Sequence, residues 1–200
     1  MNPEQLFPLL PEAMQKPSRW TGFLRRKGAR AGVDLSVVTF GAGRPLPLID
    51  NEAGTMRLGR IFLAAGSRLW AHKGGELALG DGTVLDFGAE VIAWARVTIG
   101  KNCYLGWDAL VLDTDLHHIG GHPLVNKPVT VGDNVYIGCR AIILKGVTIG
   151  DGALIHPGSI VTRDVPAGAT VAPPEATIKE RLPSCAHAVA DPWEMQEDSL

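Results

Sequence analysis

The stretch VTVGDN VYIGCR AIILKG VTIGDG ALIHPG SIVTRD, residues 129–164, decides the fold. Every sixth position holds a β-branched residue, and a small or apolar residue lies two places before each of them. The β-branched set is Val131, Ile137, Ile143, Ile149, Ile155 and Val161, and the set that precedes it is Val129, Val135, Ala141, Val147, Ala153 and Ser159. Turn-forming pairs then follow, as at Asp133-Asn134, Asp151-Gly152 and Pro157-Gly158. A period of six does not match the i, i+3, i+4, i+7 pattern of an amphipathic helix, so it predicts a repeat of short strands.

Strand geometry turns this repeat into a solenoid. Residues two apart share one face of a strand, so the two apolar residues of each hexad point the same way. One hexad then makes one flat wall that ends in a tight corner. Three walls close a triangular coil, and successive coils pair as parallel strands about 4.8 Å apart.

The same frame extends upstream, which sets the predicted domain boundaries. The expected inward pairs there are Leu85 and Phe87, Val91 and Ala93, Val97 and Ile99, Cys103 and Leu105, and Ala109 and Val111, with Leu77 and Leu79 as a further wall. We therefore expect an all-β protein: a parallel β-helix of roughly six coils over residues 57–172. Residues 1–56 form an N-terminal flank and cap, and residues 173–200 form a tail, both flanks being irregular or briefly helical.

Composition narrows the function classes. The net charge of −2 gives no electrostatic case for nucleic acid. No apolar run approaches the ~20 residues of a membrane span, and the N-terminus lacks the positive region of a secretory signal. The cysteines are three and widely spread, which favours a reducing, cytoplasmic setting. The register makes Cys103 a core residue and places Cys139 on an outward corner.

The repeat stops after Val111 and resumes at Val129. The intervening segment, LDTDLHHIGGHPLVNKP, is either one distorted coil or an extruded loop. Because breaking a strict repeat costs stability, the interruption is a candidate functional site.

Four polar side chains fall within six residues of this segment: Asp113, Asp115, His117 and His118. Histidine suits base catalysis near neutral pH, and a carboxylate two residues away can orient its ring. His122 is a weaker candidate base. The alternative is a polar loop that simply contains histidines.

Trp107 and Asp108 are expected on an outward corner next to this segment. An exposed Trp beside a cleft suits stacking on a sugar ring, and packing in a subunit interface is the alternative. We expect Trp107, Asp108 and His118 to contact the acceptor.

The strings VTVGDNVYIG, VTIGDGALI and GSIVTRDVP closely resemble the hexapeptide-repeat acyltransferases, above all the galactoside/maltose acetyltransferase and sugar O-acetyltransferase branch. The likeness covers about residues 77–172. It implies a left-handed β-helix, a homotrimer with active sites between neighbouring subunits, and direct transfer from acetyl-CoA to a small acceptor, most naturally a carbohydrate. It implies His117 as the general base, with His118 as the fallback and no metal.

The resemblance also implies a coenzyme A site on the later coils. Its expected residues are Tyr136, Gly138, Cys139, Pro157, Gly158, Thr162 and Arg163. Small side chains at Gly138, Pro157 and Gly158 would permit close approach of the pantetheine arm. The chain departs from the family where a Gly-x-Pro-Ala-Lys-like turn is common, since residues 171–175 read VAPPE.

Two rival hypotheses remain at the level of sequence. One is a gamma-carbonic-anhydrase-like zinc enzyme that uses His72, His117 and His122. The other is a non-catalytic structural subunit, which Cys139 in place of a common Ser and the altered end of the coenzyme A site favour.

Overall fold

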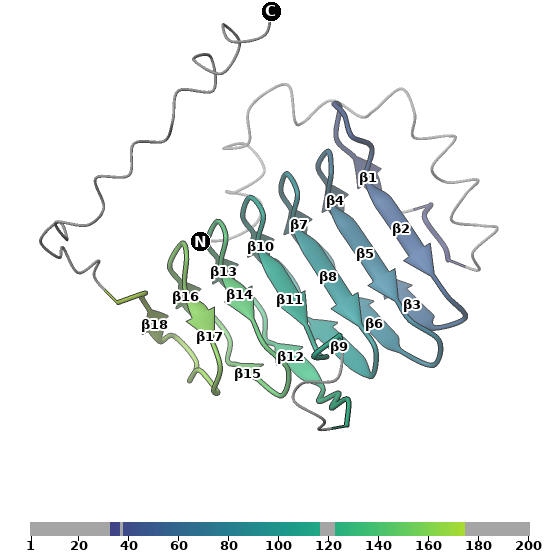
Figure 1. The fold of residues 1–200 in the computed structure, drawn as a ribbon. Coiled ribbons are helices and arrows are strands. Elements are labelled where there is room, and N and C mark those ends of the chain that lie inside the picture. Colours follow the sequence, from purple (N-terminus) through teal and green to yellow (C-terminus); the bar gives the residue numbers. More distant parts are fainter. Residues whose placement is uncertain (1–32, 37, 117–122, 175–200) are drawn as a thin grey trace, which may run out of the picture.

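The computed structural model describes residues 33–36, 38–116 and 123–174, which form a single stack of short parallel strands (Figure 1). The architecture is the predicted left-handed parallel β-helix, with three walls and one strand per wall in each coil. Within the described ranges there is no helix, and therefore none that could span a membrane.

Each wall is a parallel sheet whose strands come from successive coils. The first wall contains β1 (Thr39–Phe40), β4 (Phe62–Leu63), β7 (Val84–Leu85), β10 (Tyr104–Leu105), β13 (Tyr136–Ile137), β16 (Leu154–Ile155) and β18 (Thr170–Val171). The second wall contains β2 (Leu48–Asn51), β5 (Arg68–Ala71), β8 (Glu90–Ala93), β11 (Leu110–Leu112), β14 (Ile142–Ile143) and β17 (Ile160–Val161). The third wall contains β3 (Thr55–Leu58), β6 (Glu76–Leu79), β9 (Arg96–Ile99), β12 (Val129–Val131) and β15 (Thr148–Ile149).

We name the corners by the walls that they join. The first corner joins the first wall to the second, and the second corner joins the second wall to the third. The third corner leads from the third wall to the first wall of the next coil. Strands of the stack begin at Thr39, so coil structure already occurs upstream of the clear hexad repeat.

The core is the narrow interior between the walls. All twelve inward residues predicted between Val129 and Val161 are buried, including Ser159, which is 1% exposed. The upstream set is also buried, Cys103 included, with the exception of Phe87. The inward periodicity therefore predicts the core of this chain correctly over most of its length.

The prediction for Phe87 is wrong, and the length of β8 explains why. This strand has four residues and turns a second inward side chain, Ala93, into the core after Val91. Because this strand is longer, the inward positions of the preceding wall lie two residues earlier than the hexad repeat predicts. Its inward residue is therefore Leu85 and not Phe87. Phe87 instead lies on the first corner, where it packs against a separate apolar cluster of Phe62, Ala64 and Val84.

The irregular segment is an extruded loop and not a distorted coil. Tyr104 and Leu105 pair directly with Tyr136 and Ile137, although about thirty residues separate the two strands along the chain. Strand β11 still pairs with β8 and β14, and β12 with β9 and β15. The extra residues, 113–128, therefore leave the stack at the second corner and return to the same coil.

Candidate active site

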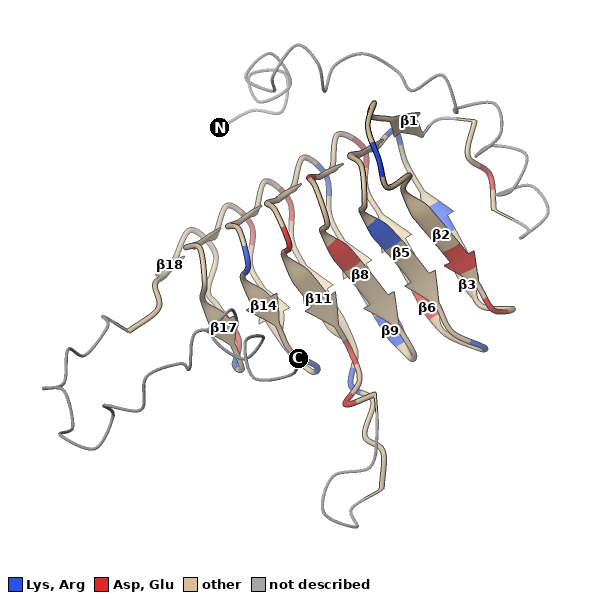
Figure 2. Cartoon of the chain, turned by 45° about the horizontal axis from the view of Figure 1, so that its top comes forward, with Lys and Arg blue, Asp and Glu red and all other residues tan. Residues whose placement is uncertain are grey.

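The extruded loop projects from the second corner, below β11 in Figure 2. Its base is closed by backbone hydrogen bonds: the N–H of Lys127 donates to the carbonyl of Asp113 at 2.8 Å. The carbonyl of Lys127 in turn accepts the N–H of Gly146, in the next coil, at 3.0 Å. The two ends of the loop are thus fastened to each other and to the stack.

Asp113 is fully buried and bonds only to backbone in the described structure. Its Oδ1 accepts the N–H of Trp94 at 2.8 Å, and its Oδ2 accepts the N–H groups of Ala95 and Arg96 at 2.7 and 2.6 Å. The strand register puts Asp113 where Ala71 and Ala93 lie in the coils before it. A carboxylate at this position can reach the corner of the preceding coil, so Asp113 holds that corner together.

Asp115 forms an ion pair and hydrogen bond with Lys145, which lies on the second corner of the next coil. Both side chains are about three quarters buried, with 21% and 26% exposed. Nothing in the sequence marks Lys145 as a site residue, because a Lys-Gly turn is typical of an ordinary corner. The ion pair brings a cation to the base of the loop.

The loop then turns at Leu116, which adopts a left-handed conformation with φ of 62°. Its N–H donates to Oγ1 of Thr114, a buried residue, at 3.0 Å. The predicted base His117, its fallback His118, and His122 follow and lie outside the described residues.

Thr162 and Arg163 lie on the same second corner, one coil beyond Lys145, because Ile142 and Ile143 pair with Ile160 and Val161. They line a hollow at the C-terminal end of the stack together with Asp164 and Pro166. Two of the residues predicted for coenzyme A thus share a corner with the two predicted carboxylates.

Apart from Tyr136, the remaining described residues of the predicted site lie on the first corner, at the other end of the second wall. Backbone hydrogen bonds stack Trp107 above Cys139, and Cys139 above Pro157 and Gly158. Trp107 is 55% exposed and meets the ring of Phe87 edge-on, with centroids 6.2 Å apart. Asp108 lies 3.6 Å from Arg140 in an exposed ion pair. The outward corner is as predicted, but the three residues of β11, about 10 Å of strand, separate it from the loop.

Gly138 is required by coil stacking. A Cβ built on Gly138 would lie 2.5 Å from the backbone nitrogen of Pro157. Gly158 is different: its φ is 72° and a Cβ there would meet no atom within 4 Å. Open space along this corner is therefore found at Gly158 and not at Gly138.

Tyr136 stacks on Tyr104 on the outer face of the first wall, with ring centroids 5.2 Å apart and planes 7° from parallel. The Tyr104 hydroxyl donates to the buried carboxylate of Asp86, whose other oxygen accepts the N–H of Phe87 at 2.8 Å. Burial, followed by this hydrogen bond, raises the pKa of Tyr104 well above its ordinary value. Burial also raises the pKa of Tyr136, so both phenols stay protonated at neutral pH.

Cys139 is partly exposed on its corner, and Cys103 is buried in the core, as the register predicts. Burial raises the pKa of Cys103 to about 11. The two thiols therefore differ in access, and only Cys139 belongs to a predicted site.

An aromatic cluster of Trp70, His72 and Trp94 lies beside the second corner, in the two coils that precede the loop. The rings of His72 and Trp94 are stacked at 4.0 Å, and Trp70 meets both edge-on. Glu52 places Oε2 2.8 Å from Nδ1 of His72. No local sequence pattern reveals this cluster, because Glu52, His72 and Trp94 are about twenty residues apart from one another in turn and meet only through the stacking of coils.

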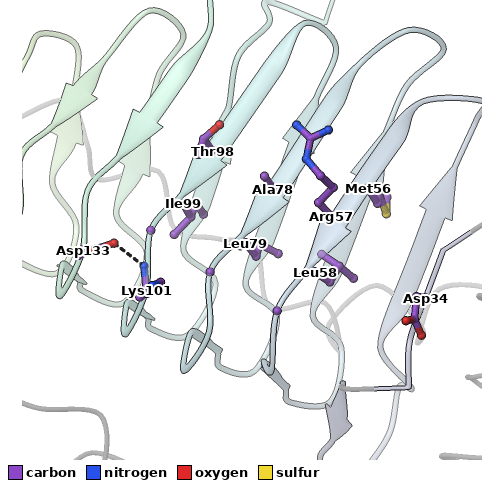
Figure 3. Close-up of a pocket in the computed structure, with 13 residues that line it drawn as sticks. Asp34, Met56, Arg57, Leu58, Ala78, Leu79, Thr98, Ile99, Lys101 and Asp133 are labelled. Carbon is purple, nitrogen blue, oxygen red and sulfur yellow. Dashed lines mark hydrogen bonds between the residues drawn. The ribbon is translucent and has the colours of Figure 1, made fainter.

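A hollow of about 610 Å³ lies on the outer face of the third wall (Figure 3). The small residues Ala78 and Gly80 are part of its lining. Asp34 lies at one end in Figure 3, and Lys101 and Asp133 lie at the other. Asp133 accepts the N–H of Lys101 at 2.7 Å, which ties two coils together. None of the predicted site residues that the structure describes lines this hollow.

Among the described residues, no group of three or more His, Cys, Asp or Glu side chains is arranged to hold a metal ion. Of the histidines in the zinc hypothesis only His72 is described, and its Nδ1 faces Glu52. Figure 2 shows both signs of charge interspersed along the coils.

Known proteins share this repeat and fold. The bacterial transferase hexapeptide (six repeats) family model matches residues 128–163. A 2,3,4,5-tetrahydropyridine-2,6-dicarboxylate N-acetyltransferase of Staphylococcus aureus is 41% identical over 84 residues, which is 42% of this chain and 33% of that protein. The galactoside O-acetyltransferase of Escherichia coli K12 is 30% identical over 128 residues, 56% of this chain and 60% of that protein. The chain thus spans a third and three fifths of the length of these relatives.

Among solved structures, the acetyltransferase domain of PglB from Neisseria gonorrhoeae, determined with acetyl coenzyme A, superposes with a TM-score of 0.50. The identity is 16%, and the match covers 74% of this chain and 60% of that one, so it supports the fold alone. Repeat, corners and loop define a hexapeptide-repeat β-helix protein. The sequence matches are narrower: residues 128–163 carry the bacterial transferase hexapeptide repeat, and the two relatives that match over longer stretches are both acetyltransferases.

Proposed function

We propose that this protein is an acetyl-CoA-dependent acyltransferase that transfers its acyl group directly to a hydroxyl or amine of a small acceptor, in the first instance the hydroxyl of a sugar. The observation that carries the proposal is the loop extruded from an otherwise unbroken hexapeptide stack, with two acidic side chains fixed at its base. The galactoside O-acetyltransferase relative supports a sugar acceptor. The cysteine pattern supports a cytoplasmic setting.

In the proposed reaction His117 acts as general base, with His118 as the fallback. The base removes the proton of the acceptor hydroxyl as its oxygen attacks the thioester carbonyl. The C–S bond then breaks, and the departing thiolate takes the proton from the imidazolium. No acyl-enzyme is needed, because a thioester is already activated and the protein has only to hold the two substrates together.

The two acidic residues have different roles in this proposal. Asp113 is a positioning residue: its three bonds to the backbone of residues 94–96 fix the point where the loop begins. Asp115 pairs with Lys145, which fixes the second residue before the base. Neither residue needs to exchange a proton during turnover.

Coenzyme A is proposed to lie along the later coils, past Cys139, Pro157 and Gly158 and on to Thr162 and Arg163. Cys139, Pro157 and Gly158 lie on the first corner, and Thr162 and Arg163 lie on the second corner. The two groups are therefore on opposite sides of the second wall. Tyr136 and Gly138 border this path, Gly138 through the close approach of its coil to Pro157. Arg163 is the cation proposed for the phosphates.

We further propose that the active unit is a homotrimer. The predicted residues occupy two corners of one chain, and a neighbouring subunit can bring the first corner of one copy to the loop of another. Exposed apolar side chains on two walls, Leu154 at 38% and Ile160 at 62%, support association between copies. Light scattering coupled to size exclusion measures the mass directly, and a monomeric mass would refute this part of the proposal.

The proposal is tested by titrating acetyl-CoA into the wild type and His117→Ala by calorimetry, and by measuring transfer to a panel of sugars. We expect both proteins to bind acetyl-CoA and only the wild type to transfer the acetyl group. His118→Ala tests the fallback: loss of transfer in His118→Ala, with transfer retained in His117→Ala, would make His118 the base. A wild type that binds no coenzyme A would overturn the enzyme proposal and favour a structural subunit.

A further inference from the structure

We propose that Trp94, supported by Trp70 and His72, is the platform that binds the sugar ring of the acceptor. This inference rests on the proposed acyltransferase function and names the acceptor part of its site. It moves the aromatic contact from Trp107, on the first corner, to the corner from which the loop emerges.

The cluster holds the Trp94 indole in a fixed orientation. One face of the ring is covered by His72 at 4.0 Å, with the planes 17° apart, and Trp70 packs edge-on at 6.3 Å. Glu52 anchors the imidazole at 2.8 Å, and the guanidinium of Arg68 lies 4.6 Å from the centre of the Trp70 ring. A ring held in this way needs no ordering when a ligand binds, which favours affinity.

The other face of Trp94 is turned along the stack toward the loop. Backbone bonds and strand register align Glu52, His72 and Trp94 in successive coils, and Thr114 occupies the next position. Thr114 is short and buried, and its hydroxyl accepts the Leu116 N–H, so it supplies no ring to continue the stack. Among the described residues, Trp94 makes ring contacts only with Trp70 and His72.

Trp94 is linked to the base of the loop both by a hydrogen bond and along the chain. Asp113 accepts the N–H of Trp94 at 2.8 Å, and the chain reaches Asp115 two residues later. Coils repeat about every 4.8 Å, so a ring resting on Trp94 lies within one or two coil spacings of the Asp115–Lys145 pair. The proposed base, His117, follows Asp115 by two residues along the chain.

The chemistry of the surface suits a pyranose. A sugar ring offers an apolar C–H face and a rim of hydroxyls, and Trp combines a large apolar face with a polar N–H. The buried Nε1 donors of Trp70 and Trp94 have no acceptor among the described residues. Because unpaired buried donors are rare, two of them in one cluster mark a place that another polar group completes.

The first test is steady-state kinetics with methyl galactopyranoside and methyl glucopyranoside as acceptors. We expect Trp94→Leu to raise the acceptor KM about tenfold or more, because truncating an aromatic anchor removes most of its contact energy. The KM for acetyl-CoA should be unchanged, and Trp94→Phe should restore most of the acceptor affinity. Trp107→Leu tests the competing placement of the aromatic contact on the first corner. An unchanged acceptor KM in Trp94→Leu, or the same loss in Trp107→Leu instead, would overturn the inference.

The second test does not depend on transfer. Indole N–H signals of the protein labelled with ¹⁵N are followed during titration with the same pyranosides, and Trp70→Phe, Trp94→Phe and Trp107→Phe assign the peaks. We expect the Trp70 and Trp94 signals to shift and that of Trp107 to stay, with glycerol as the non-ring control. Shifts without transfer would support the platform and count against the acyltransferase, whereas transfer to sugars without these shifts would sink the platform alone.

Discussion

The carboxylate of Asp113 accepts the backbone N–H of Trp94 at 2.8 Å, so the first residue of the extruded loop is bonded to the corner of the coil before it. The two further bonds to Ala95 and Arg96 use the second oxygen. A single buried side chain thus supports both the corner of one coil and the exit of the loop from the next.

We expect Asp113→Ala to lower the free energy of unfolding by about 2–4 kcal/mol, because it leaves partly buried N–H groups without an acceptor. Asp113→Asn should cost less, since its amide keeps one acceptor oxygen. Some loss remains, because its NH2 group would face backbone N–H groups of residues 94–96. Urea denaturation followed by circular dichroism measures both. Equal stability of wild type and Asp113→Ala would contradict the positioning role.

The Asp115–Lys145 pair should be coupled energetically. A double-mutant cycle with Asp115→Asn and Lys145→Met is expected to give a coupling free energy of unfolding of roughly 1–2 kcal/mol, more than a fully exposed pair provides. Each single variant should also lower the transfer rate, because it frees the segment that carries the proposed base. The exposed pair Asp108–Arg140 is the control cycle, with near-zero coupling.

Cys139 and Cys103 should differ sharply in alkylation. At pH 8 in a Cys185→Ser background, iodoacetamide is expected to modify Cys139 and to spare Cys103, whose thiol is buried and has a pKa of about 11. Acetyl-CoA should slow the modification of Cys139 if it lies along this corner. Mass spectrometry of peptides resolves the two sites, and rapid labelling of native Cys103 would contradict the core assignment.

The raised pKa of Cys103 also predicts how the free energy of unfolding depends on pH. The folded thiol keeps its proton up to about pH 11, whereas the unfolded thiol loses it near its ordinary pKa of 9.0. This contribution to stability is therefore fully present below pH 9 and falls as the pH rises through 11. Cys103→Ala should remove this part of the alkaline loss of stability, as measured by urea titrations between pH 8 and 10.5.

Tyr104→Phe should lower the free energy of unfolding by about 1–3 kcal/mol, because Asp86 is 2% exposed and would lose the hydroxyl that it accepts. Changing both partners, as in Tyr104→Phe with Asp86→Ala, should cost less than the sum of the two single changes. Denaturant titration of the four proteins checks this. Additive losses would show that the two side chains are independent.

Position 140 offers a stabilising change. Gly88, Asp108, Arg140 and Gly158 occupy equivalent left-handed positions on the first corner, with φ between 54° and 72°. Arg140→Gly is expected to raise the free energy of unfolding by about 0.5–1 kcal/mol, since the left-handed penalty exceeds the entropy cost of glycine. Gly88→Ala should do the reverse, because its Cβ would lie 2.3 Å from Oδ1 of Asp108.

The hexad pattern predicts the fold because a narrow interior accepts only small and β-branched side chains at fixed intervals. It fails at Phe87, where a longer strand in the second wall shifts the frame, which no local signal announces. The pattern also locates the interruption at residues 113–128. It cannot reveal partners such as Lys145 for Asp115, or Trp94 for His72, because those contacts depend on which coils become neighbours.

The register across the loop has an evolutionary consequence. Because β10 pairs with β13 as in a coil without a loop, the segment between Thr114 and Lys127 is an interchangeable cassette. Sequence can be inserted, deleted or exchanged there while the buried Asp113 and Thr114 and the side chains that fill the interior stay the same. Specificity for new acceptors can therefore diversify at one corner while the scaffold and its proposed cofactor groove stay constant.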